Sequence, residues 1–135
     1  MYVADLTRRD LILLVNLAQD DLWLAHVDLA GAGMSHINLE KADLRVANLS
    51  GCDLTYSQLA GAHLEGANLS HANLQGADIT GANLMNSDVR GANLRHATLE
   101  SAITGGMEYD AATVWPDGVD PADLGATLAT SAQWH

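Results

Sequence analysis

The stretch ANLSHANLQGADITGANL (residues 67–84) carries the pattern that decides the fold. A large aliphatic side chain returns at every fifth position, at Leu69, Leu74, Ile79 and Leu84. Ala stands two positions before each of them, and Asn or Asp lies in between. The repeating unit is therefore A-(N/D)-L-x-x, and Gly is frequent at its last place.

The same register continues in both directions from this stretch. Leu, Ile, Val or Met fills the large aliphatic position of all sixteen units from Leu24 to Leu99. The small position is Ala in ten units, and the exceptions are Leu22, Val27, Ile37, Cys52, Ser57 and Ser87. Asn or Asp occupies the place between them in eleven units, and Gly ends seven. Such regularity indicates a repeat architecture.

A period of five fits neither a regular helix nor a regular strand. Five residues of α-helix turn the chain by about 140° from its starting face, which spreads the large positions around the cylinder. In a strand, an odd spacing places alternate side chains on opposite faces. A chain that turns a corner in every unit instead keeps both apolar positions inside and the Asn or Asp outside. Such coils stack as parallel strands about 4.7–4.9 Å apart, with Asn, Asp and Gly stabilising the corners.

These units resemble the pentapeptide-repeat family, and the resemblance covers Leu22 to Ser101. It implies an all-β solenoid, a right-handed quadrilateral β-helix with four units in each coil and so about four coils. One departure is the absence of Phe, which many members place at the large central position. Ile79 and Val89 only vary the aliphatic residue there.

The chain divides into three parts. Residues 1–21 are expected to form an N-terminal cap, residues 22–101 the pentapeptide-repeat β-helix, and residues 102–135 a C-terminal cap and tail. A solenoid exposes its core at both ends, so each end needs a cap. Thr7 is placed as the N-cap of an amphipathic helix over residues 8–18, which we expect to lie over the first coil.

The C-terminal part begins where the repeat fails, with Thr104 at the next large position. Residues 109–118 have the apolar and aromatic content to plug the last coil, and they are similar to a closing segment in many bacterial members of the family. Asp120 and Pro121 predict the start of a short helix, as N-cap and first helical residue. The weakly amphipathic tail that follows leaves three outcomes open: it folds back on the rod, joins two subunits as a homodimer, or frays.

Length and charge limit the class of protein. The 135 residues fit one domain, and six Lys and Arg stand against 17 Asp and Glu for a net charge of −11. Because phosphate binding depends on Lys and Arg, this balance argues against direct nucleic-acid binding. The longest apolar run, Leu11–Val15, is too short for a signal peptide or a membrane helix, so we expect a cytoplasmic protein without membrane contact. A single cysteine, Cys52, excludes an intramolecular disulfide and a multi-cysteine metal site.

The pattern predicts a protein that is not an enzyme, with no catalytic, cofactor-binding or metal-binding residues and no cofactor. The six histidines, which lack the spacing of a metal site, are His26, His36, His63, His71, His96 and His135. The first five fall on outward repeat positions. His63 lies one coil from Asp43, which predicts a charge-assisted contact. Cys52, at an inward small position, is expected to be buried and inert.

Two functions remain open. The first is an interaction or scaffold module for an unknown protein partner, a common use of repeat architectures. The second is implied by the resemblance, since some family members bind DNA gyrase or topoisomerase IV by imitating duplex DNA in shape and charge. Residues 22–101 carry a net charge of −4, and residues 102–135 carry −5 without any Lys or Arg. Nearly half of the net charge therefore lies in residues 102–135, beyond the repeats, which favours the interaction module.

Overall fold

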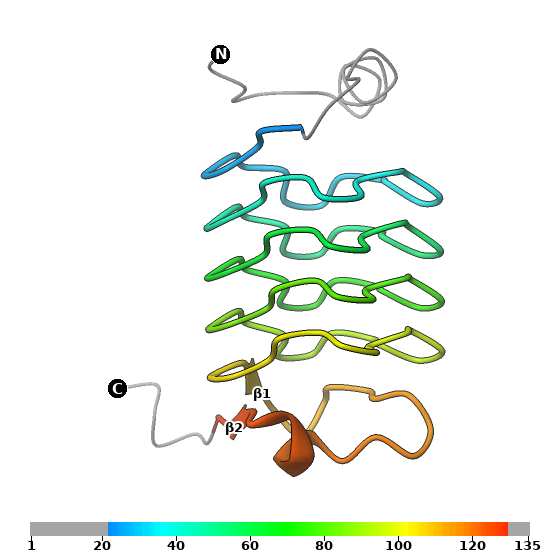
Figure 1. Ribbon diagram of the computed structural model, residues 1–135, viewed down its shortest axis with the longest axis vertical. Coiled ribbons are helices and arrows are strands. Elements are labelled where there is room, and N and C mark those ends of the chain that lie inside the picture. Colours follow the sequence, from blue (N-terminus) through cyan, green and yellow to red (C-terminus); the bar gives the residue numbers. More distant parts are fainter. Residues whose placement is uncertain (1–21, 130–135) are drawn as a thin grey trace.

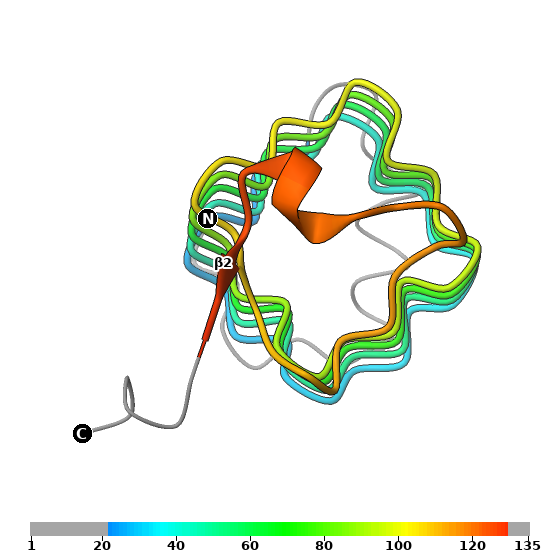
Figure 2. The same cartoon turned by 90° about the horizontal axis from the view of Figure 1, so that it is seen from below.

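The computed structural model describes residues 22–129, whose backbone forms a stack of four-sided coils (Figure 1, Figure 2). Parallel bridges join outward residues 20 positions apart, from Trp23 with Asp43 to Asp88 with Glu108. Since one turn of the stack takes 20 residues, each coil holds four five-residue units. The fold is therefore a β-solenoid, as the resemblance implied.

Backbone hydrogen bonds hold each unit in two directions. Between coils, Leu44 N donates to His63 O at 2.7 Å, and Asp43 N donates to Leu22 O at 2.8 Å. At the corner that follows, Ala47 N donates to Leu44 O at 3.1 Å. The coils are thus bonded to the coils before and after them, while each corner is closed by its own turn.

The outward Asn and Asp side chains explain why the corners form. Eleven units have Asn or Asp at the outward place. In each of them the side-chain Oδ1 accepts a hydrogen bond from the backbone N–H two residues later, as Asn48 does from Ser50 at 3.1 Å. The last residue of the unit takes a left-handed conformation, which Gly51 adopts with a φ of 66° at no steric cost. Nine non-glycine residues also take a positive φ, among them Val46 at 59°.

The two inward series fill the interior of the coils. Every large position from Leu24 to Leu94 is buried, and the small positions let these layers interlock. Cys52 is buried at a small position, where its Sγ donates to Leu29 O at 2.9 Å. The core is therefore a continuous aliphatic column along the rod.

The stack continues beyond residue 101, where the sequence pattern ends. Ile103, Glu108 and Val114 extend the parallel ladder on three faces. Val114 pairs with Asn93, 21 residues earlier, so one extra residue is accommodated in this last coil. The backbone ladder thus persists after the Ala and Leu pattern has been lost.

The C-terminal segment folds back beneath the last coil (Figure 1). The 3₁₀ helix η1 (Pro121–Leu124) follows the predicted N-cap, because Asp120 Oδ1 accepts a hydrogen bond from Ala122 N at 2.9 Å. Strand β2 (Thr127–Leu128) then pairs in parallel with β1 (Glu108–Tyr109). Of the three outcomes left open for the tail, folding back is the one observed as far as residue 129.

Aromatic and polar side chains close the core at this end. Tyr109 and Trp115 pack edge to face with ring centroids 5.4 Å apart, and both contact the core, as expected of residues 109–118. Thr104 is buried at the next large position, and its Oγ1 donates to Leu124 O at 2.6 Å. This bond ties the last coil to the folded-back segment.

Some expectations fall outside the described residues. The predicted N-terminal helix over residues 8–18 and the end of the tail, residues 130–135, belong to this group. Within residues 22–129, no helix is long and apolar enough to span a membrane.

Candidate functional site

The five-residue units stack into four outer faces, numbered in chain order. Face 1 comprises residues 22–26, 42–46, 62–66, 82–86 and 102–106, and face 2 comprises residues 27–31, 47–51, 67–71, 87–91 and 107–111. Face 3 comprises residues 32–36, 52–56, 72–76, 92–96 and 113–117, and face 4 comprises residues 37–41, 57–61, 77–81 and 97–101. Because the coil is four-sided, face 1 lies opposite face 3, and face 2 lies opposite face 4 (Figure 2).

Exposed large apolar side chains lie on two of these faces only. Face 1 carries Trp23, Val46, Met85 and Ile103, and face 3 carries Tyr56 and Val114. The described units of faces 2 and 4 carry none, and one further exposed residue, Leu128, belongs to β2. Exposed apolar side chains that gather on some faces and are missing from others point to contact with a partner, so faces 1 and 3 are the candidates for binding.

Acidic charge gathers on the other two faces. Face 2 has Asp28, Asp88, Glu108 and Asp110 against Arg90, a net of −3, and face 4 has Glu40, Asp78 and Glu100 against Lys41, a net of −2. Face 1 has Asp43 and Glu65 against Arg45, and face 3 has Asp53 and Asp117 against Arg95, so each carries a net of −1. Apolar exposure and net charge are therefore separated onto alternate sides of the rod.

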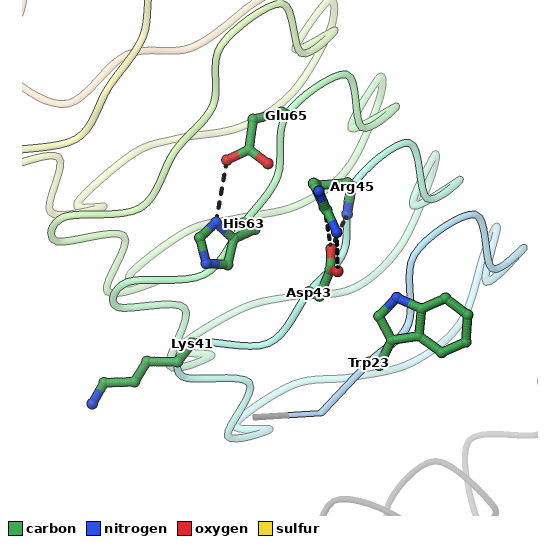
Figure 3. Close-up of a pocket in the computed structure, with 6 residues that line it drawn as sticks. All are labelled: Trp23, Lys41, Asp43, Arg45, His63 and Glu65. Carbon is green, nitrogen blue, oxygen red and sulfur yellow. Dashed lines mark hydrogen bonds and ion pairs between the residues drawn. The ribbon is translucent and has the colours of Figure 1, made fainter. Parts of the chain in front are cut away.

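Face 1 also contains an open hollow near the N-terminal end of the described rod (Figure 3). It is lined by Trp23, Lys41, Asp43, Arg45, His63 and Glu65. Arg45 binds Asp43 at two points, with Nη2 at 2.7 Å from Oδ2 and Nε at 2.9 Å from Oδ1. Hydrogen bonding to Arg45 lowers the pKa of Asp43, and the same bond raises the pKa of Arg45. The pair is neutral as a whole, so Glu65 supplies the net charge of this face.

His63 lies beside Asp43 in the ladder but does not pair with it. The parallel bridge between them places the two residues on neighbouring coils, as the spacing predicted. However, Asp43 is occupied by Arg45, and His63 Nδ1 lies 3.4 Å from Glu65 Oε1 (Figure 3). The charge of His63 still contributes to the lowered pKa of Asp43, as predicted, but the hydrogen-bonded partner of each carboxylate lies in its own unit. Residues two apart in an extended unit project to the same side, so each carboxylate meets the partner in its own unit first.

The sequence comparison agrees with this geometry. The family model for pentapeptide repeats matches eight copies, over residues 24–55, 47–86 and 80–103. The chain belongs to the pentapeptide-repeat family. No curated protein sequence matches the chain significantly.

Solved structures similar to this pentapeptide-repeat protein include Rfr23 from the cyanobacterium Cyanothece 51142. The two are 39% identical with a TM-score of 0.67, over 70% of this chain and 63% of Rfr23. The protein alr5209 from Nostoc PCC 7120 is 30% identical with a TM-score of 0.36, over 81% of this chain and 86% of its own. A trypsin-treated variant of QnrB1, a plasmid-mediated fluoroquinolone resistance protein, is 21% identical with a TM-score of 0.55, over 84% of this chain and 61% of its own. The chain thus spans less than two thirds of the Rfr23 and QnrB1 structures.

The other candidate residues of this pentapeptide-repeat protein stay apart. His36 and His96 share a column, but Tyr56 lies between them and stacks on His36 with ring centroids 5.4 Å apart. Within residues 22–129, no group of three or more His, Cys, Asp or Glu is arranged to hold a metal ion. Burial raises the pKa of the Cys52 thiol to about 11, so little thiolate forms there at neutral pH.

The concentration of apolar side chains on face 1 was not predicted from the sequence. A signal for it was present, because Trp23 and Ile103 stand at the outward place where most units have Asn or Asp. With 20 residues in a coil, these two positions fall in one column. Grouping the outward residues by that register, rather than counting total charge, reveals the face.

Proposed function

We propose that this pentapeptide-repeat protein is a non-enzymatic module that binds a protein partner through its outer faces. The observation that carries the proposal is the confinement of exposed large apolar side chains in the repeats to faces 1 and 3. Every protein exposes some apolar side chains because it has too few polar ones to cover its surface. If that were the only cause here, the exposed apolar side chains would be spread over all four faces. Proteins built from stacked repeats commonly present such extended surfaces to partners.

The rigidity of the faces supports the same function. Each outward residue belongs to a backbone that is bonded to the coils before and after it, and the eleven Asn and Asp side chains fix the corners. A partner therefore meets a surface that is already ordered, and little conformational entropy is lost on binding. This favours recognition by shape over chemistry on a bound substrate.

Imitation of DNA toward DNA gyrase or topoisomerase IV has less support. QnrB1 is only 21% identical to this chain, so the likeness concerns the fold alone. Duplex DNA is negatively charged on all sides, whereas faces 1 and 3 carry a net of −1 each and expose apolar side chains. A supercoiling assay with DNA gyrase tests this alternative, and unchanged activity at micromolar protein would remove it.

A homodimer through the C-terminal tail is a further part of the proposal. Its support is the exposed Leu128 of β2, which lies at the end of the ladder beyond β1. Light scattering tests it directly, since a mass near 14.2 kDa in solution excludes the dimer.

Site-specific photo-cross-linking in the native cell tests the interaction module. The cross-linker replaces Met85 on face 1 or Tyr56 on face 3, and the control position is the exposed Gln58 on face 4. We expect one defined protein to be captured from face 1 or face 3 and none from Gln58. Capture of the same proteins from all three positions, or of none from faces 1 and 3, would contradict the proposal.

A further inference from the structure

We propose that the last rung of face 3, residues 113–117, is the docking site for a strand of the chain's own residues 132–135, with Trp134 packed against Trp115. A rung here means the unit of one face in one coil. The docked strand adds a rung to the parallel ladder and covers the apolar end of the core. The proposal goes beyond the interaction module, because it concerns the end of the rod rather than its outer faces.

The strand edge of this rung is open toward the end of the rod. In the repeats, neighbouring rungs exchange two backbone bonds: Leu44 N donates to His63 O at 2.7 Å, and His63 N donates to Ala42 O at 2.9 Å. The equivalent groups here are Trp115 N and Thr113 O, and neither is hydrogen-bonded within the part of the chain that the structure describes. In Figure 2, which looks onto this end, η1 and β2 lie over the interior and over face 2, and the rung of face 3 is left uncovered. Such an open edge is a template for another strand.

Strand β2 sets the register in which the chain approaches this edge. It pairs in parallel with β1 and places Leu128 beside Tyr109, so the two strands are 19 residues apart. The bonding continues to the last described residue, since Ala129 N donates to Tyr109 O at 2.7 Å. In the coil above, the chain passes from β1 on face 2 to residues 113–117 on face 3. The chain after β2 therefore reaches the open rung if it follows the same path.

The sequence after Ala129 has the pattern that this register requires. A separation of 19 places residues 132–134, Ala-Gln-Trp, next to residues 113–115, Thr-Val-Trp. Small, outward and large positions then coincide. The interval agrees too, because a Trp follows Tyr109 by six positions and another follows Leu128 by six, whereas the large residues of the repeats are five apart. The extra residue of the last coil is thus repeated in the segment that would lie next to it.

Partly uncovered apolar side chains at this end favour the docking of a Trp. Trp115 packs edge to face on Tyr109, and both are only partly buried. Leu128, which shares the inward position of Tyr109, is 48% exposed. A Trp side chain buries a large apolar area. Trp134 seated on Trp115 beside Leu128 therefore supplies most of the affinity of the strand.

Charge and chain length favour the chain's own strand over a second copy. Residues 130–135 contain no Asp, Glu, Lys or Arg, whereas residues 102–135 as a whole carry a net charge of −5. A neutral strand adds no charge to this acidic end, but the end of a second copy would bring five more negative charges. Only residues 130 and 131 separate Ala129 from the proposed strand, so its effective concentration at the rung is high.

A disulfide test on the full chain checks the register. One variant combines Val114→Cys with Gln133→Cys, and the control combines Val114→Cys with Ala132→Cys, both in a Cys52→Ala background. Paired residues of adjacent strands bring their Cα atoms to about 4.8 Å, within the range of a disulfide. In a glutathione buffer we expect the first pair to have an effective concentration at least tenfold above that of the control, whose second Cys lies on the other side of the strand.

Two results of this test would overturn the proposal. Equal effective concentrations for both pairs would mean that the strand has no fixed register on the rung. A disulfide between two chains, seen as a doubled mass on a gel without reductant, would mean that the strand is exchanged between subunits and does not dock on its own chain.

Amide hydrogen exchange provides a second measurement without new cysteines. The Trp115 N–H should exchange at least tenfold faster in Trp134→Ser than in the native chain. Gln133→Ser is the matched control, because an outward side chain contributes little to docking, and it should leave the rate within about twofold. The Leu94 N–H, which donates to Val114 O at 2.7 Å, should stay protected in both variants and so reports an intact last coil. An unchanged Trp115 rate in Trp134→Ser, or equal acceleration by both variants, would overturn the proposal.

Failure of this proposal is distinguishable from failure of the interaction module. The substitutions at residues 132–134 leave the cross-linking positions Met85 and Tyr56 unchanged. Capture of a defined protein from those positions therefore supports the interaction module whether or not the strand docks.

Discussion

A double-mutant cycle on Tyr56 and Gly76 tests how corner side chains pack along the rod. Tyr56 stacks on His36 with an interplanar angle of 14°. Gly76, 20 residues later, has a φ of 71°, and a Cβ added there would overlap the Tyr56 ring. Gly81 is the matched control, because its φ is 68° and nothing lies within 4 Å of an added Cβ. Substitution by Ala thus meets the same backbone strain at both positions, but only at Gly76 does the added Cβ also meet an aromatic ring.

The expected magnitudes follow from these surroundings. An L-residue in the left-handed region costs about 1–2 kcal/mol, and replacing Gly by Ala returns about 0.4–1 kcal/mol through the unfolded chain. Gly81→Ala should therefore lower the free energy of unfolding by about 1 kcal/mol. Gly76→Ala also displaces the half-exposed Tyr56 ring and loses its stacking, which is worth about 0.5–1.5 kcal/mol. Its total cost should be about 2 kcal/mol.

Urea denaturation followed by circular dichroism measures the cycle. Both glycine substitutions are made in the native chain and in the Tyr56→Ala background. In that background we expect Gly76→Ala to cost no more than Gly81→Ala, which gives a coupling of about 1 kcal/mol between the two positions. Equal costs of the two glycine substitutions in the native chain would refute the packing argument. A cost of Gly76→Ala that is unchanged by removal of the ring would do the same.

Three further substitutions or measurements probe other features. Val46→Asn should raise the free energy of unfolding by about 0.5–1 kcal/mol, since Asn tolerates the left-handed conformation that strains Val; a lower urea midpoint would count against this. The buried Ser57 and Ser87 hydroxyls have no hydrogen-bond partner among the described residues. Ser57→Ala and Ser87→Ala should therefore each raise the free energy of unfolding by about 1 kcal/mol in the same assay. A lower free energy of unfolding would show that the hydroxyls are hydrogen-bonded. Cys52, with its pKa raised to about 11, should react with a thiol reagent about 1,000-fold more slowly in the folded chain than in urea; rapid labelling of the folded chain would contradict its burial.

The sequence predicts the features of this fold that repeat locally. The five-residue period places Leu and Ala inside, and the turn chemistry of Asn, Asp and Gly forms the corners. The N-cap at Asp120 is equally local, and the structure confirms it. The ladder beyond residue 101 depends on tertiary contacts instead, since Thr104 is held by Leu124 of a segment 20 residues away. The register also predicts that His63 lies beside Asp43, and the charge of His63 does act on that carboxylate. Which carboxylate the imidazole bonds to depends on the side-chain geometry within the unit, and it is Glu65.

The repeat pattern alone does not predict which outward residues share a face, and the candidate site is one such face. Alternation within a unit separates inside from outside, but the grouping of outward residues into faces depends on the number of residues in a coil. Trp23 and Ile103 are 80 residues apart in sequence and still share a column. The apolar residues that replace Asn or Asp fall on face 1 because they are separated by multiples of 20 residues, the length of one coil.

At position 46, the stability of the fold and the binding of a partner favour different residues. Stability alone favours Gly or Asn at a corner with a φ of 59°, so the strained valine costs stability while it adds apolar surface to face 1. In a solenoid each coil contacts only its neighbours, and the effect of a corner substitution should remain local. Val46→Asn is therefore expected to raise the urea midpoint and to reduce the cross-linking of a partner from Met85 on face 1 at the same time. If Val46 had no role in binding, the substitution would raise the urea midpoint and leave the cross-linking unchanged, and that result would argue against face 1 as a binding face.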